Sequence, residues 1–156
     1  MPNNAWSAEI PLVGAGGEVV DLRRTLLSHG FVELPPMSLD EDVPALELTL
    51  AVNGNARTVE IRPGRRGSAR VGVLGRAPSA RTAEELVASV RHVLALDEDL
   101  SDFYELVSGD PELSWVASGA GRMIRAPSVF EDVVNTSCTW ATHPRPSRAA
   151  LRPSRA

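Results

Sequence analysis

The stretch ALELTLAVNGNARTVEIRPGRRGSARVGVL, residues 45–74, decides the fold of this chain. In residues 45–52 leucine or valine alternates with glutamate, threonine or alanine, the period of two expected of a strand with one apolar face. Asn53-Gly54 follows, and both residues tolerate the positive φ angles of a tight hairpin turn. The sequence therefore predicts an antiparallel meander of strands over 45–52, 57–62 and 69–74, with a loop over 63–67.

Helical patterns flank the meander on both sides. Before it, residues 18–29 carry leucines at helical spacing, and Gly30 favours the left-handed end of a helix. After it, Thr82 and Glu85 have the spacing of a capping box ahead of apolar residues at every fourth position to Leu94. Further helices are predicted over 99–107 and 111–116, with another beginning over 129–136. The fold class is therefore α+β, a small antiparallel sheet with flanking helices. We expect one core that contains Leu46, Leu48, Leu50, Val59, Ile61, Val71, Leu86, Val90 and Leu94.

Composition limits the classes of function. The chain has 156 residues and a net charge of -4, which argues against a nucleic-acid-binding surface spread over the whole molecule. All 16 basic residues are arginine, so no lysine can form a Schiff base. A single cysteine and three scattered histidines offer no disulfide and no zinc-ligand spacing, and we expect no metal and no cofactor. No membrane-spanning run or signal segment is present, so we expect a cytoplasmic protein that does not bind membranes.

Three stretches carry a resemblance to a known family. They are LDEDLSDFYEL (96–106), DPEL (110–113) and GRMIRAPSVFEDVV (121–134). Together they resemble bacterial 3-methyladenine DNA glycosylase II and its 8-oxoguanine-glycosylase relatives, the helix-hairpin-helix DNA glycosylases. In that family an arginine-containing segment, a proline and then Phe-Glu-Asp mark the passage into the helical catalytic domain. The order of a helix, Pro35-Pro36 and a strand meander is similar to the family's N-terminal domain, which has a TATA-binding-protein-like sheet.

The resemblance implies a domain organisation and an activity. Residues 8–95 would be the glycosylase N-terminal α+β domain, and residues 96–139 the start of an incomplete, all-α glycosylase domain. Residues 140–156, rich in Arg, Pro, Ser and Ala, would be a disordered tail that is out of frame. The implied function is DNA repair by base excision, with cleavage of the N-glycosidic bond of alkylated or oxidised bases. The implied partner is double-stranded DNA that contains a damaged base, bound by a monomer.

The catalytic parts of the family are not found in this chain. It has no Leu-Pro-Gly-Val-Gly-like hairpin and no aspartate after Asp132, so no catalytic residue is assigned and we expect the fragment to be inactive alone. Residues 135–139 begin the pattern Ile-Cys-Thr-Thr-Asn with a serine in place of the isoleucine. A short deletion would instead align residues 138–140 with a Cys-Ser-Trp further on. In both alignments the match stops by Trp140.

Two groups of residues are candidates for DNA contact. Arginines at positions 62, 65, 66, 70 and 76 surround the meander loops and could touch phosphates, although an ordinary solvated loop is the alternative. The family resemblance adds two places to these candidates for DNA contact. They are the arginine-containing segment before the proline and the residues that, in the family, lie near the gap that a flipped base leaves in the DNA. The resulting set is Arg65, Arg66, Arg125, Asn135 and Thr136.

Other motifs have simple structural interpretations. Asp97, Glu98, Asp99 and Asp102 lack the glycine and closing glutamate of a calcium loop and fit a solvated first helical turn. Residues 14–17, Gly-Ala-Gly-Gly, lack the spacing and lysine of a phosphate loop and fit a plain turn. Glu131 and Asp132 suit the start of a helix. Phe103, Tyr104 and Trp115 are predicted to be core residues.

The alternative function is a non-catalytic α+β module that binds DNA or protein through the sheet alone. Such a module would need a basic concave sheet face to bind DNA, and the negative net charge speaks against one.

Overall fold

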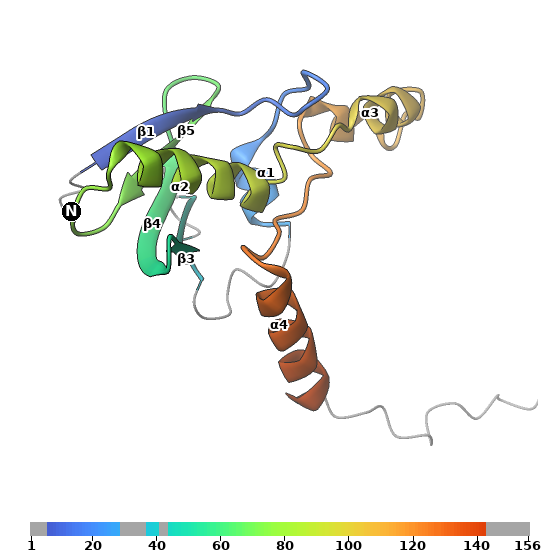
Figure 1. Cartoon of the computed structure of the whole chain (residues 1–156). Helices are drawn as coiled ribbons and strands as arrows, with labels where there is room; N and C mark the ends of the chain where they lie inside the picture. Colours follow the sequence, from blue (N-terminus) through green and yellow to red (C-terminus); the bar gives the residue numbers. More distant parts are fainter. Residues whose placement is uncertain (1–5, 29–36, 41–43, 143–156) are drawn as a thin grey trace, which may run out of the picture.

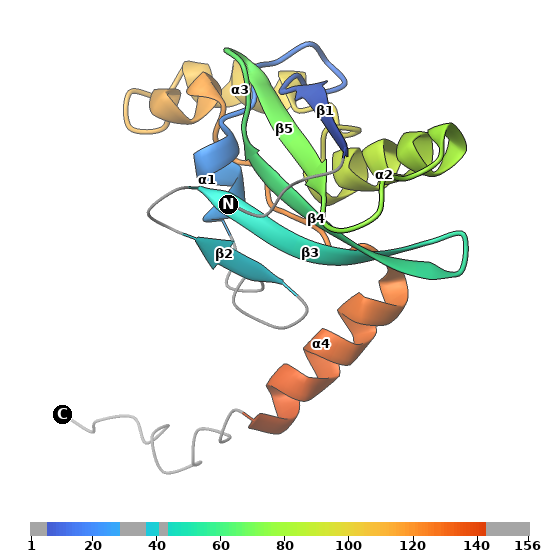
Figure 2. The same cartoon turned by 90° about the vertical axis from the view of Figure 1, so that its left-hand side faces the viewer.

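A computed structural model describes residues 6–28, 37–40 and 44–142. Five antiparallel strands form one sheet in the order β1-β5-β4-β3-β2, and helices pack around it (Figures 1 and 2). The α+β class predicted from the sequence is confirmed. The strands are β1 (Trp6–Pro11), β2 (Ser38–Asp40), β3 (Ala45–Val52), β4 (Asn55–Pro63) and β5 (Ser68–Val73).

The meander follows the alternation in the sequence. Leu48 pairs with Val59, which in turn pairs with Val73, so the apolar residues of β3, β4 and β5 share one face. Asn53 and Gly54 have φ angles of 51° and 73°, the positive values that the tight turn requires. The predicted strands are confirmed, except that β4 begins two residues earlier than expected because the turn is so short.

The two edge strands were not predicted. β1 pairs with β5, with Ile10 opposite Ala69, and β2 pairs with β3, with Leu39 opposite Leu46. Each strand is short, and β2 has only three residues. The partner of β1 lies far along the chain, so no local turn signal indicates this strand, whereas β2 precedes its partner β3 directly but is too short to show a pattern.

The helices differ from the predictions mainly at their ends. α1 (Leu22–Leu26) is shorter than the predicted 18–29, because Val13 and Val19 form an isolated β-bridge and Asp21 caps the helix that follows. α2 (Ala80–Val93) is capped by Ser79 and not by Thr82. The helix begins earlier than predicted, so Thr82 already lies in its first turn and donates its backbone N–H to Ser79 Oγ at 3.3 Å. Glu85 does not close a capping box and pairs instead with Arg81, at 3.3 Å.

One core joins the sheet to α1 and α2. α2 covers the apolar face of the sheet, and the nine predicted core residues are all buried in this cluster. Ile124, which lies far along the chain, also belongs to it.

A smaller second cluster lies between α3 (Ser101–Ser108) and the 3₁₀ helix η2 (Ser114–Ser118). Tyr104 is buried there as predicted, and its hydroxyl donates to the carbonyl of Ala120 at 2.6 Å. The core prediction was wrong for Phe103 and Trp115, which are 40% and 56% exposed. The pair of α3 and η2 is too small to bury the apolar side chains on both of its faces.

The chain then leads into α4 (Val129–Thr142), which projects away from the sheet and α2 (Figures 1 and 2). α4 includes residues 140–142, the first three of the predicted tail. The predicted helix end at Gly30, the Pro35-Pro36 turn and residues 143–156 of the predicted tail lie outside the described residues. None of the helices in the described ranges is both long and apolar enough to cross a membrane.

Candidate functional site

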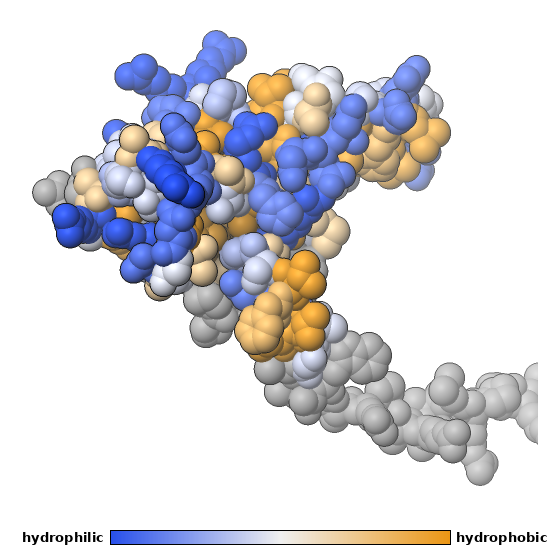
Figure 3. Space-filling model, viewed as in Figure 1, coloured by the Kyte–Doolittle hydropathy of each residue, from blue (hydrophilic) through white to orange (hydrophobic). Residues whose placement is uncertain are grey.

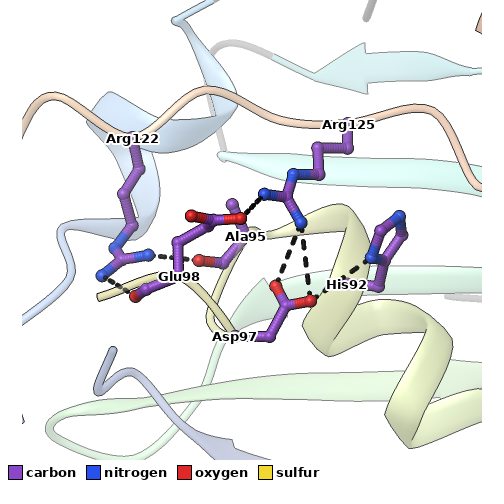
Figure 4. Close-up of polar contacts among 6 residues, drawn as sticks. All are labelled: His92, Ala95, Asp97, Glu98, Arg122 and Arg125. Carbon is purple, nitrogen blue, oxygen red and sulfur yellow. Dashed lines mark hydrogen bonds and ion pairs between the residues drawn. The ribbon is translucent and has the colours of Figure 1, made fainter. Parts of the chain in front are cut away.

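Arg122 is the centre of a buried junction between distant parts of the chain (Figure 4). Its side chain is fully buried, and its guanidinium donates to the backbone carbonyls of Ala95 and Glu98 and to the carboxylate of Glu18. The carboxylate of Glu18 also accepts the backbone N–H of Leu100, at 2.9 Å. The junction therefore ties the loop before α1, the α2–α3 connection and the segment that leads to α4.

Sequence analysis did not identify this junction. Glu18 and Arg122 are 104 residues apart, and the other two acceptors are backbone carbonyls that carry no sequence signal. The role of the junction is structural, because its charges are paired and hydrogen-bonded in the interior.

The glycine-rich turn at residues 14–17 packs against this junction. A Cβ on Gly14 would collide with the guanidinium of Arg122, and one on Gly16 would collide with the carboxylate of Asp99. The backbone N–H groups of Gly14, Ala15 and Gly17 donate to carbonyls of the chain itself. These amides are not free to hold a phosphate, which confirms the interpretation as a plain turn.

Arg125 is held by a second, more exposed set of charges (Figure 4). Its guanidinium pairs with Asp97 at 3.3 Å and with Glu98, while His92 Nδ1 lies 3.4 Å from Asp97 Oδ2. Burial raises the pKa of the Asp97 carboxyl, but its hydrogen bonds, to its own backbone and to His92, together with the charge of Arg125, outweigh burial and leave the pKa below its ordinary value. Much of the positive charge of Arg125 is therefore already compensated.

The acidic residues at 97–102 are exposed as predicted, but only Asp102 lies in the first turn of a helix, because α3 begins at Ser101 and the other three precede it. Asp99 accepts the N–H and the hydroxyl of Ser101, at 2.9 and 2.6 Å, and these hydrogen bonds lower the pKa of its carboxyl. Within the described ranges no group of three or more His, Cys, Asp or Glu side chains could hold a metal ion.

The five predicted DNA-contact residues do not form one site. Arg65 and Arg66 are exposed in the turn between β4 and β5, whereas Asn135 and Thr136 belong to α4. Figures 1 and 2 show this turn at one end of the molecule and α4 at the other. Arg125 lies in the connection to α4.

The face of the sheet opposite α2 is not basic. The strand register places Glu9, Asp40, Glu47 and Glu60 on this face, against only Arg62 and Arg70. A surface with more carboxylates than guanidinium groups would repel DNA phosphates. The alternative of a DNA-binding module that uses the sheet face is therefore disfavoured.

α4 presents an uncovered apolar surface. Its start is fixed by Ser128, whose hydroxyl accepts the backbone N–H of Glu131 at 3.3 Å, so Glu131 belongs to the helix cap as predicted. Phe130 and Val134 are 75% and 41% exposed, which confirms the prediction that they would be incompletely covered. Val129 and Val133 are exposed with them, and Figure 3 shows apolar side chains gathered on this helix.

Comparisons with known proteins give a likeness in fold but none in sequence. No family model matches the chain, and no curated protein matches it in sequence. Among solved structures, the fold resembles that of a 3-methyladenine DNA-glycosylase from Archaeoglobus fulgidus, with a TM-score of 0.59 and 19% sequence identity. The match covers 82% of this chain and 42% of the glycosylase chain, so this chain spans less than half the length of the protein whose fold it shares.

Proposed function

We propose that this chain is the N-terminal part of a DNA-repair glycosylase that excises alkylated or oxidised bases. The observation that carries the proposal is the fold match to a 3-methyladenine DNA-glycosylase over most of this chain and less than half of that one. The likeness in fold agrees with the resemblance of residues 96–134 to DNA glycosylases of the 3-methyladenine type.

The surface of α4 supports the interpretation as a fragment. A helix with Phe130 75% exposed and Val129 79% exposed leaves a large apolar area in water, which folded monomers rarely tolerate on one element. Other helices would cover this face in the complete protein. In this proposal residues 96–139, with α3, η2 and α4, begin the helical glycosylase domain, and the chain departs from the family near Trp140.

The described carboxylates do not supply the chemistry of base excision. A glycosylase must extrude its target nucleotide and stabilise a positively charged sugar with a carboxylate. Among the described acids with candidate roles, Glu131 belongs to a helix cap, while Asp97 and Glu98 pair with Arg125. The proposed catalytic aspartate and the DNA-gripping hairpin would therefore lie in the part of the glycosylase that this chain does not contain.

A glycosylase assay tests the proposal. The 156-residue chain and a longer chain with the helical domain restored from the downstream reading frames are incubated with duplexes that contain 3-methyladenine or 8-oxoguanine. We expect base release by the longer chain only. Release by the 156-residue chain would refute the fragment interpretation, and an inactive but folded longer chain would refute the glycosylase assignment.

A further inference from the structure

The turn between β4 and β5 concentrates positive charge in a chain that is negative overall. Residues 62–70, RPGRRGSAR, hold four arginines and no acid, while the whole chain has a net charge of -4. Arg62 and Arg70 are direct cross-strand partners on the face opposite α2. Like charges in such positions destabilise a sheet unless carboxylates compensate them, and here Glu60 pairs with Arg62 while Glu9 lies opposite Arg70.

The backbone of this turn is held firmly. Gly64 donates to the carbonyl of Ser68 at 3.0 Å, and Ser68 donates to that of Arg65 at 2.8 Å. Gly67, with a φ angle of 77°, accepts the N–H of Leu12 at 2.9 Å and so ties the turn to a neighbouring segment. A ligand that binds here would order little additional backbone, which lowers the entropy cost of binding.

The carboxylate nearest to the turn accepts a hydrogen bond from the backbone instead of pairing with an arginine side chain. Glu9 is the cross-strand neighbour of Arg70, yet its Oε2 accepts the N–H of Arg65 at 3.1 Å. The guanidinium of Arg70 instead donates to Ser7 Oγ, at 3.4 Å.

The remaining charge of the turn is open to solvent. Arg62 is paired with Glu60, whereas the guanidiniums of Arg65 and Arg66 are exposed and have no partner among the described residues. A hollow of about 310 Å³ lies beside them, lined by Glu9, Pro63, Gly64, Arg65 and Arg70. Around this hollow the three guanidiniums of Arg65, Arg66 and Arg70 outnumber the single carboxylate of Glu9, so positive charge is in local excess.

We propose that Arg65, Arg66 and Arg70, here named the arginine turn, bind the phosphate backbone of duplex DNA without reading its sequence. Guanidinium groups match phosphate oxygens with paired hydrogen bonds, and such contacts position a protein on DNA without selecting bases. The acidic remainder of the molecule confines the contact to this turn. The inference rests on the proposed function only in its choice of DNA as the polyanion.

The position of the arginine turn gives it a separate role from α4. Both views of the chain show the turn at the end of the molecule remote from α4 (Figures 1 and 2). DNA bound at the turn would therefore contact the sheet domain itself, at a site remote from α4.

Binding to an undamaged short duplex tests the inference, measured by fluorescence anisotropy at several NaCl concentrations. The test variant is Arg65→Gln/Arg66→Gln, which leaves the backbone hydrogen bonds of the turn intact. The matched control is Arg76→Gln/Arg81→Gln, which removes the same charge from exposed positions outside the turn. Thermal unfolding confirms that both variants remain folded.

The expected result is a selective loss of salt-dependent affinity. Each phosphate contact contributes about 0.9 to the slope of log K against log salt, so losing two should reduce this slope by ~1.8. The affinity ratio of wild type to test variant should then shrink about 12-fold between ~50 and ~200 mM NaCl, while the control keeps the wild-type slope.

Three outcomes would overturn the inference: no binding by the wild-type chain at ~50 mM NaCl, an unchanged slope in the test variant, or an equal loss in the control. The assay uses undamaged DNA and needs no base release, so its result is distinguishable from failure of the glycosylase proposal. Turn-dependent binding by the 156-residue chain, together with no base release by the folded longer chain, would count against the proposed function alone.

Discussion

Replacing Arg122 with methionine should destabilise the protein strongly. The side chain of Arg122 is fully buried, and that of its partner Glu18 is only 7% exposed. The substitution leaves a buried carboxylate with the N–H of Leu100 as its remaining partner. It also removes one donor from each of the carbonyls of Ala95 and Glu98, which keep a backbone N–H donor. Breaking a buried pair in this way costs about 3–5 kcal/mol.

Urea denaturation at neutral pH measures this loss as a lower midpoint at an unchanged m-value. The matched control is Arg125→Met, because Arg125 is 32% exposed and its partners Asp97 and Glu98 are 51% exposed. An ion pair as exposed as this contributes at most about 1 kcal/mol.

A double-mutant cycle with Glu18→Gln sharpens the test. In the Arg122→Met background, Glu18→Gln should cost little or be stabilising, because it removes the unpaired charge while its amide oxygen still accepts from Leu100. A coupling energy under about 0.5 kcal/mol, or equal losses for Arg122→Met and Arg125→Met, would refute the reasoning.

Five further substitutions test the fold. Leu48→Asp should cost at least about 4 kcal/mol, because it puts an unpaired charge into the core of the sheet, and loss of the cooperative thermal transition in circular dichroism checks this. Ser79→Ala should cost about 1 kcal/mol in urea denaturation and Thr82→Ala clearly less, since Ser79 is the cap; the reverse order would restore Thr82 as the cap. Burial raises the pKa of Tyr104 above its ordinary value, so its contribution to stability is complete below about pH 10 and lost as the pH rises through the folded-state pKa. Tyr104→Phe should abolish that alkaline loss while costing about 1–2 kcal/mol near neutral pH, and an unchanged alkaline profile of the urea midpoint would contradict this. Phe130→Gln should change the free energy of unfolding by less than about 0.5 kcal/mol and reduce self-association in gel filtration; a large loss of stability would show that α4 packs on the rest of the chain.

The local patterns of the sequence were sufficient for the meander and its core. Alternation in residues 45–52 and the Asn53-Gly54 turn fix both the strands and their register, because the side-chain period of a strand decides which face is buried. The helical spacing of Leu86, Val90 and Leu94 likewise identified the face of α2 that packs on the sheet. The exposed apolar surface of α4 was also predictable from the sequence.

The tertiary structure decided the features that depend on distant partners. β1 pairs with β5, which lies far along the chain, and β2 has only three residues, too few to carry a pattern of their own. Only the fold showed that α3 and η2 form a unit too small to bury Phe103 and Trp115.

The charged residues show most clearly the difference between what the sequence predicts and what the tertiary structure adds. The sequence presents Arg65, Arg66, Arg122 and Arg125 as equivalent cations. The fold buries Arg122 against Glu18, pairs Arg125 with two carboxylates and leaves Arg65 and Arg66 exposed on a rigid turn. The role of a charge depends on its solvation and on the groups within a few ångströms, and chain folding brings those groups together from positions as far apart as 104 residues.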